Sequence, residues 1–217
     1  MFETLEIQNI QSDRILTLPQ TTWEEYERLS DDSNSGYKIS YFNNEITIVS
    51  PSRNHEIIAQ IINLLVITFC RKYQISYFNL GSADIKKQFI AVKQPDNSYC
   101  FKSKRDIPDL AVEVNFTSGS IDDLEKYKLL GVPEVWILRM ETLPSKELVP
   151  HSRRQNSQIT FYRIIDGEYI SQAASFFLFN PDPESGMALD SIFLNRYIKR
   201  GLTEDNLTLE ADFFNAL

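Results

Sequence analysis

The stretch IPDLAVEVNFTSGSIDDLEKYKLLGVPEVW, residues 107–136, carries the patterns of a strand, a helix and a second strand in succession. Leu110, Val112 and Val114 alternate with other residues, which is the pattern of a strand with one face in a core. The helical pattern that follows ends at Gly131, a residue suited to closing a helix. Because further helices and strands surround this stretch, the sequence predicts a mixed α/β fold with a central sheet.

The first strand of this stretch also carries two acids, Asp109 and Glu113. Positions four apart in a strand lie about 13 Å apart, whereas oxygen ligands sit about 2 to 2.5 Å from a metal ion. The two acids therefore cannot share one ion, and a partner for Glu113 must come from a neighbouring strand. Asp96 in QPDNSYCF is the candidate, because adjacent antiparallel strands lie about 5 Å apart. Alternatively, these acids lie on a solvated strand face, and Asp109 after Pro108 only marks where the strand begins.

The composition sets limits on function and location. The chain has 217 residues and a net charge of −8, which argues against a protein that coats nucleic acid through many phosphate contacts. A nuclease is not excluded, because metal ions can supply positive charge within an acidic site. Cys70 and Cys100 lack a CxxC spacing, so we expect neither structural zinc nor a disulfide framework. With no signal peptide and no apolar run long enough to span a bilayer, we expect a cytoplasmic protein without membrane contact.

Local signals predict the elements around the central stretch. Thr22 and Glu25 form a capping-box pattern for a short helix, and Asn43-Asn44 indicates the turn of a hairpin. Asp166-Gly167 indicates the turn of a second hairpin. Between the N-terminal hairpin and the later strands, SPSRNHEIIAQIINLLVITFCRKY predicts one long helix. Its expected buried side comprises Ile57, Ile58, Ile61, Ile62, Leu65 and Phe69.

Taken together, SPSRNHE, LGSADIKKQ, QPDNSYCF, the stretch from Pro108 to Trp136 and DGEYI resemble the Uma-two family of restriction endonucleases. That family is assigned to the PD-(D/E)XK nuclease superfamily. The resemblance implies a mixed α+β, restriction-endonuclease-like fold with a central mixed sheet flanked by helices. It also implies a single domain over 1–217, with an N-terminal helix and hairpin at about 20–50, a nuclease core at about 51–140 and a C-terminal hairpin and helices at about 158–217.

The activity implied by the resemblance is hydrolysis of DNA phosphodiester bonds that depends on Mg²⁺, with Mn²⁺ as a substitute. Asp96 in QPD matches the family's metal-binding aspartate, and Glu113 in AVEV matches its second acidic ligand. Asp109 matches a recurrent aspartate of undefined role. DNA is the implied partner, and cutting both strands of a duplex would favour a homodimer.

The lysine of the superfamily is displaced in this chain. Asn115 stands two residues after Glu113, where the superfamily has lysine, and Asp123 stands where this family has a lysine on the following helix. Lys126 lies one turn further along and is the candidate for a group that holds the attacking water. Its alternative role is an ion pair with Asp122 or Asp123.

Two further residues have open roles. Glu45 could lie at the edge of the site or be an exposed residue of its hairpin. His55, in a histidine–glutamate pair shared with the family, could contact a phosphate or act as a base. It could equally be a surface residue beside the helix cap, which is the interpretation that its position favours.

Two functions follow from these patterns. The first is a metal-dependent deoxyribonuclease with Asp96 and Glu113 as ligands and Lys126 as the water-positioning group. The second is a catalytically degenerate member of the fold that acts as a non-enzymatic DNA- or protein-binding module. The acidic net charge and the displaced lysine favour the second function more than they would for a typical nuclease.

Overall fold

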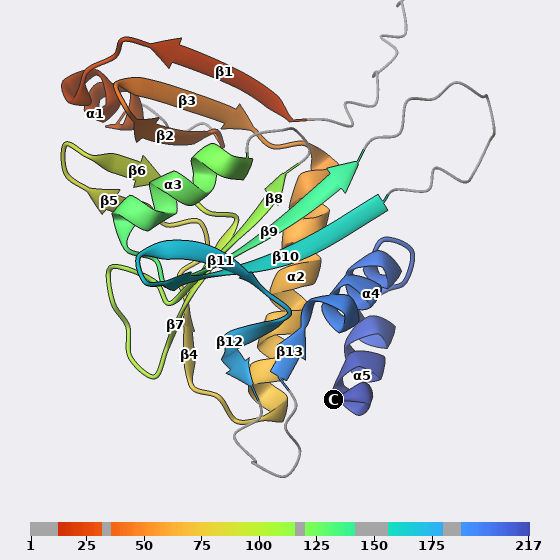
Figure 1. Ribbon diagram of the computed structural model, residues 1–217. Helices are drawn as coiled ribbons and strands as arrows, with labels where there is room; N and C mark the ends of the chain where they lie inside the picture. The colour runs from red at the N-terminus through yellow and green to blue at the C-terminus, as the bar shows by residue number, and fades with distance from the viewer. Residues whose placement is uncertain (1–12, 32–35, 116–119, 142–155, 180–187) are drawn as a thin grey trace, which may run out of the picture.

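The computed structural model describes residues 13–31, 36–115, 120–141, 156–179 and 188–217. Within these ranges the chain forms two large sheets, one two-stranded sheet and five helices (Figure 1). The helices are α1 (Trp23–Asp31), α2 (Arg53–Lys72), α3 (Ser120–Leu130), α4 (Ser191–Gly201) and α5 (Asn206–Ala216). The strands are β1 (Arg14–Pro19), β2 (Lys38–Phe42), β3 (Glu45–Ser50), β4 (Tyr77–Asn79), β5 (Ile85–Lys87), β6 (Ala91–Lys93), β7 (Asn97–Phe101), β8 (Leu110–Asn115), β9 (Glu134–Glu141), β10 (Asn156–Ile165), β11 (Glu168–Gln172), β12 (Ala174–Phe179) and β13 (Ala188–Asp190).

The central sheet has six strands in the order β11-β10-β9-β8-β7-β4. Strands β8 and β9 are parallel and are joined through α3, whereas the other neighbours are antiparallel. The predicted central mixed sheet flanked by helices is therefore confirmed. The stretch at residues 107–136 supplies its parallel pair and the connecting helix.

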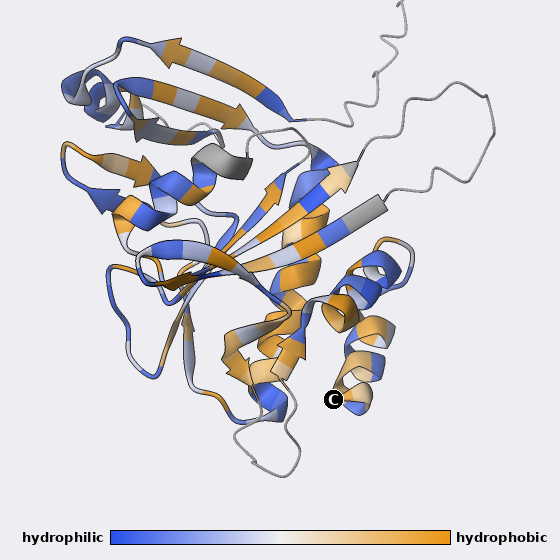
Figure 2. Ribbon diagram, viewed as in Figure 1, coloured by the Kyte–Doolittle hydropathy of each residue, from blue (hydrophilic) through white to orange (hydrophobic). Residues whose placement is uncertain are grey.

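The alternation in β8 divides the core into two layers. Leu110, Val112 and Val114 pack in the cluster that contains α2, α4 and α5, and hydrophobic residues run along the middle of α2 (Figure 2). Ala111 packs on the opposite face, in the cluster that contains Tyr127 of α3. Each fully buried aliphatic side chain contributes about 1.5–3 kcal/mol. Alternate positions of one strand thus stabilise both layers and set the direction in which Glu113 points.

Five of the six residues that the sequence predicted for the buried side of α2 are buried, and the sixth is exposed. Ile58, Ile61, Ile62, Leu65 and Phe69 are buried, but Ile57 is 40% exposed. Successive helical residues are turned by about 100°, so the position before Ile58 lies at the margin of the apolar stripe. The capping box that precedes α1 is confirmed, because the Thr22 amide donates to Glu25 and the Glu25 amide donates to the Thr22 hydroxyl.

A second, antiparallel sheet has the strand order β1-β3-β2-β6-β5. Its hairpin β2–β3 turns at Asn43 and Asn44, which have φ values of 49° and 56°, as a tight hairpin turn requires. The sequence analysis predicted this hairpin but only one sheet. The second sheet arises because β6 pairs with β2, at Tyr41–Val92 and Phe42–Ala91, across a long sequence separation.

The C-terminal part covers the α2 side of the central sheet (Figure 1). The hairpin β10–β11 turns at Asp166 and Gly167, as predicted. The expected helical segment begins at Ser191, is interrupted after Gly201 and continues from Asn206, while Met187, where it was expected to start, lies outside the described residues. None of the described helices is long and apolar enough to cross a membrane.

Candidate functional site

A pocket of about 220 Å³ lies between the two large sheets, next to α3 and the beginning of α2. One side is formed by β1, β2, β3 and β6 of the five-stranded sheet, and the other by the end of β8 and the turn before β7. Its charged and polar lining consists of Asp13, Thr17, Lys38, Ser40, Glu45, Thr47, His55, Lys93, Gln94, Asp96, Glu113, Asn115, Asp123 and Lys126.

Asp96 and Glu113 line one pocket from neighbouring segments of the central sheet. Asp96 directly precedes β7, and its amide donates to the carbonyl of Val112, the residue before Glu113 on β8, at 2.9 Å. Both side chains line the pocket and both residues are buried, with 8% and 4% of their surface exposed. The strand geometry thus brings together the two acids that the sequence suggested as a pair.

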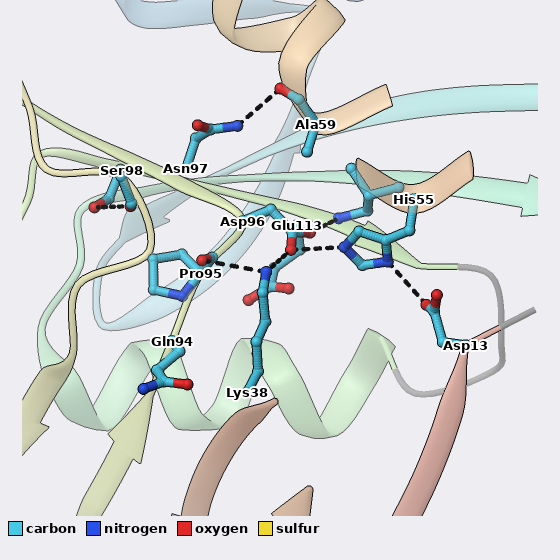
Figure 3. Close-up of polar contacts among 12 residues, drawn as sticks. Asp13, Lys38, His55, Ala59, Gln94, Pro95, Asp96, Asn97, Ser98 and Glu113 are labelled. Atoms are coloured by element: carbon cyan, nitrogen blue, oxygen red, sulfur yellow. Dashed lines mark hydrogen bonds and ion pairs between the residues drawn. The ribbon is translucent and has the colours of Figure 1, made fainter. Parts of the chain in front are cut away.

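The Asp96 carboxylate is fixed by three neighbours (Figure 3). Its Oδ2 accepts a hydrogen bond of 2.6 Å from the amide of Val114 on β8. Its Oδ1 lies 2.7 Å from Nε2 of His55 and also contacts Nζ of Lys38, which reaches across from β2. The aspartate therefore joins the central sheet, α2 and the second sheet at a single side chain.

His55 is a buried residue of the site, and the surface position favoured by the sequence is wrong. The Ser52 hydroxyl caps α2 by accepting from the His55 amide, which places the imidazole in the first turn, with 4% of the residue exposed. Its Nδ1 lies 2.8 Å from Asp13, whose other oxygen accepts from the Ser52 amide at 2.7 Å. Burial would raise the pKa of Asp13, but these contacts with His55 and Ser52 outweigh it and lower that pKa.

The Glu113 carboxylate contacts a tyrosine and a lysine. The Tyr127 hydroxyl of α3 donates to Oε1, and Nζ of Lys93 lies 3.2 Å from the same oxygen. Nζ of Lys93 is also 3.0 Å from Asp123 of α3. Lys93 therefore bridges one acid of the central sheet and one acid of the helix that covers it.

These contacts set the charge states of the bridge. Burial would lower the pKa of Lys93, but the carboxylates of Asp123 and Glu113 raise it well above its usual range. Burial would raise the pKa of Asp123, but the ammonium groups of Lys93 and Lys126 lower it. Lys93 is consequently a permanent cation near neutral pH. Lys38 differs, since burial lowers its pKa even though the charge of Glu113 opposes that shift.

The position of Lys126 is compatible with both of its expected roles. It lines the pocket, with 9% of the residue exposed, and its Nζ lies 4.0 Å from Oδ1 of Asp123. Its ammonium also faces the ring of Phe42, 6.0 Å from the ring centre. The pair with Asp123 and a place in the site are both present, while the side chain of Asp122 lies outside the described residues.

The remaining candidates fall into two groups. Asn115 lines the pocket and donates to Asp123 at 3.5 Å, and Glu45 lines it from the beginning of β3. Asp109 does not line it: this buried carboxylate accepts from the amide of Phe101 at 2.7 Å and contacts Arg105. Asp109 therefore closes the far end of the β7–β8 hairpin, as the strand spacing required.

The sequence analysis missed three charged residues of the site: Asp13, Lys38 and Lys93. Lys38 begins β2 and Lys93 ends β6, so both reach the pocket only because those strands pair in the second sheet. A lysine at the end of a strand is usually solvated, and the local pattern gave no reason to place either one beside an acid. The proximity of Lys93 to Asp96 in AVKQPD was the one available signal.

The donor set fits a divalent ion that is shared with a substrate. Mg²⁺ in phosphate-processing sites is commonly held by one or two carboxylates, with waters and substrate oxygens completing the shell. Asp96 and Glu113 provide two such carboxylates on one pocket. Across the described ranges, no cluster of three or more histidine, cysteine, aspartate or glutamate side chains could enclose an ion unaided.

Comparison with known proteins gives one family match. A solved structure from Anabaena variabilis ATCC 29413, described as "a putative nuclease belonging to DUF820", is 14% identical, with 82% of this chain and 98% of that chain covered and a TM-score of 0.48. No curated protein matches the chain. The sequence model of the Uma2 family, described as "Putative restriction endonuclease", matches residues 23–191. Because this match spans most of its length, the chain belongs to the Uma2 family.

Proposed function

We propose that this protein is an endonuclease that hydrolyses DNA phosphodiester bonds with the help of Mg²⁺, for which Mn²⁺ can substitute. The observation that carries the proposal is the pairing of Asp96 with Glu113 on one pocket, with lysines beside both acids. Paired carboxylates can hold a divalent ion, and ammonium groups can neutralise the oxygens of a phosphate. Membership of a family described as restriction endonucleases supports the same reaction.

The proposal gives roles to the two acids, to the groups that fix Asp96 and to Lys126. Asp96 and Glu113 would hold the ion, which when bound lowers the pKa of a water and offsets charge on the phosphate. Val114 and His55 fix Asp96 through hydrogen bonds of 2.6 and 2.7 Å. Lys126 would supply positive charge to the phosphate or to the attacking water from the side of α3.

The proposal also covers the substrate, the oligomeric state and the cellular location of the enzyme. DNA is the substrate that agrees with the family, and a homodimer would place one site on each strand of a duplex. A cytoplasmic location would keep the two buried cysteines, Cys70 and Cys100, reduced.

The test is incubation of the purified chain with plasmid DNA and Mg²⁺ or Mn²⁺. We expect nicked and linear products that disappear with EDTA and with Glu113→Gln. Cleavage that survives Glu113→Gln would contradict the proposed site. Asp109→Asn is the matched control, because it alters an acid of the same strand segment that lies outside the pocket.

The second candidate is a non-enzymatic binding module. It is favoured by the observation that lysines already neutralise the acids, since Lys38 contacts Asp96 and Lys93 contacts Glu113. In that case the chain would bind DNA or a protein without cutting it. The protein would then leave plasmid DNA intact in the presence of Mg²⁺, and calorimetry would detect no binding of Mg²⁺ to the protein.

A further inference from the structure

We propose that Lys93 is a catalytic residue of the site and that Asp123 is the positioning residue that holds it. This inference rests on the proposed nuclease function. Lys93 would place its ammonium beside the phosphate that Glu113 helps to bind and would stabilise the negative charge that builds on it. The evident candidate on α3, Lys126, would contribute less.

The geometry singles out Lys93 among the cations of the pocket. Its Nζ lies 3.2 Å from Glu113 and 3.0 Å from Asp123, and 13% of the side chain is exposed. An ammonium held between two carboxylates has few alternative rotamers, so it is preorganised. Lys126, by comparison, lies 4.0 Å from Asp123 and faces the Phe42 ring.

Asp123 positions Lys93 in this arrangement, a role that is separate from the pairing of Asp96 and Glu113. It is a buried acid that contacts Lys93 at 3.0 Å, Asn115 at 3.5 Å and Lys126 at 4.0 Å. A buried carboxylate is costly unless a cation compensates it. Because Lys93 is the nearer of its two cations and also touches Glu113, Asp123 directs the Lys93 ammonium toward the pocket.

The chemical step needs a fixed cation at this place. The oxygen of water bonds to phosphorus, and the bond from phosphorus to the leaving sugar oxygen breaks with its electron pair. One water proton ends on that sugar oxygen and the other on the phosphate monoester. Charge builds on the phosphate oxygens and on the leaving oxygen during this exchange. A preorganised ammonium stabilises that charge without transferring a proton itself.

The test compares steady-state cleavage kinetics and metal binding in lysine variants of the full chain. We expect Lys93→Met to lower kcat about 100-fold with little change in KM, the scale found when one preorganised electrostatic group is removed. Lys126→Met should lower kcat less. Lys86→Met is the neutral control, since this lysine pairs with Glu27 at an exposed position outside the pocket.

Exchange of the pair separates a catalytic role from a structural one. Lys93→Met leaves Glu113 and Asp123 without their shared cation and could unfold the chain, so the double variant Lys93→Asp with Asp123→Lys is measured beside it. This variant keeps one acid and one lysine in contact, and it should recover at least tenfold of the lost kcat. Titration with Mg²⁺ alone should show unchanged or tighter binding in Lys93→Met, because a competing positive charge has been removed.

The outcomes are distinct for the two proposals. Failure of the unaltered chain to cut any DNA would overturn the nuclease function and this inference with it. Cleavage by the unaltered chain that persists within threefold in a folded Lys93→Met variant would overturn only the role of Lys93. Loss of Mg²⁺ binding together with kcat would indicate a structural role and would also overturn it.

Discussion

Nε2 of His55 lies 2.7 Å from Oδ1 of Asp96, and the opposite nitrogen of the same ring lies 2.8 Å from Asp13. The two acids come from segments 83 positions apart in the chain (96 − 13 = 83). One imidazole in the first turn of α2 thus connects the segment before β1 to the centre of the pocket. Both contacts are between a ring nitrogen and a carboxylate, which are the stronger class of hydrogen bond.

Replacing this histidine should destabilise the protein. His55→Ala removes both contacts and leaves two buried acids less well compensated, so we expect the free energy of unfolding to fall by about 2–4 kcal/mol. Urea denaturation would measure it. The matched control is Ile57→Ala, an exposed position on the same helix, which should change the value by less than about 0.5 kcal/mol. Equal effects of the two substitutions would contradict the structural importance of His55.

Removing the ammonium of Lys38 should strengthen metal binding. Lys38 contacts the Asp96 oxygen that an ion would also use, so a divalent cation must compete with it. For Lys38→Met we expect Mg²⁺ to bind at least about tenfold more tightly, equivalent to about 1.4 kcal/mol. Isothermal titration with Mg²⁺ alone measures the change. Lys86→Met should leave the affinity unaltered, and weaker binding in Lys38→Met would show that the lysine does not compete with the ion.

Asp109 and Glu113 should have different roles, Asp109 in stability and Glu113 in metal binding. Asp109→Ala removes the acceptor for the Phe101 amide and for Arg105, which should lower the free energy of unfolding by about 1–3 kcal/mol. Its Mg²⁺ affinity should stay within about twofold, because the site lies about 13 Å away along the strand. Glu113→Gln should instead weaken Mg²⁺ binding. A folded Asp109→Ala protein that no longer binds Mg²⁺ would contradict this division.

Acid should weaken the contact between Lys93 and Asp123. The pKa of Asp123 is lower in the folded chain than the ordinary value of 3.8, so the unfolded chain binds more protons as the pH falls through that value. The stabilisation is present above pH 3.8 and is lost as the pH falls from 3.8 through the lower pKa of the folded chain. Urea titrations from neutral pH down to about pH 2 should therefore show a steeper decline for the unaltered chain than for Asp123→Asn. Parallel curves would mean that the pair contributes no pH-dependent stability.

Local signals were enough to predict much of the central sheet. The alternation of Leu110, Val112 and Val114 and the glycine at position 131 depend only on neighbours in the chain, and they marked β8 and the end of α3. The second sheet could not be predicted in this way. Its identity depends on pairing between β2 and β6, and short strands carry no mark of which distant strand they join.

The residues of the site also fall into those that local sequence signals predict and those that depend on distant contacts. The placement of Asp96 and Glu113 on one pocket could be predicted, because strand rise excludes Asp109 and strand spacing favours an acid from the neighbouring segment. The burial of His55 could not, because the face of the first helical turn depends on what packs against it. Lys38 and Lys93 were missed for the same reason, as their neighbours are set by the contact between the two sheets.

The paired acids Asp96 and Glu113 and the lysines that contact them, Lys38 and Lys93, come from different sheets. The central sheet carries Glu113 and positions Asp96, whereas Lys38 and Lys93 belong to the five-stranded sheet. A change in the spacing between the sheets would alter the Lys38–Asp96 and Lys93–Glu113 distances and leave the spacing between the two acids unchanged. The affinity of Asp96 and Glu113 for a divalent cation would therefore depend on how closely the two sheets pack, because the lysines act as counter-ions only at short range.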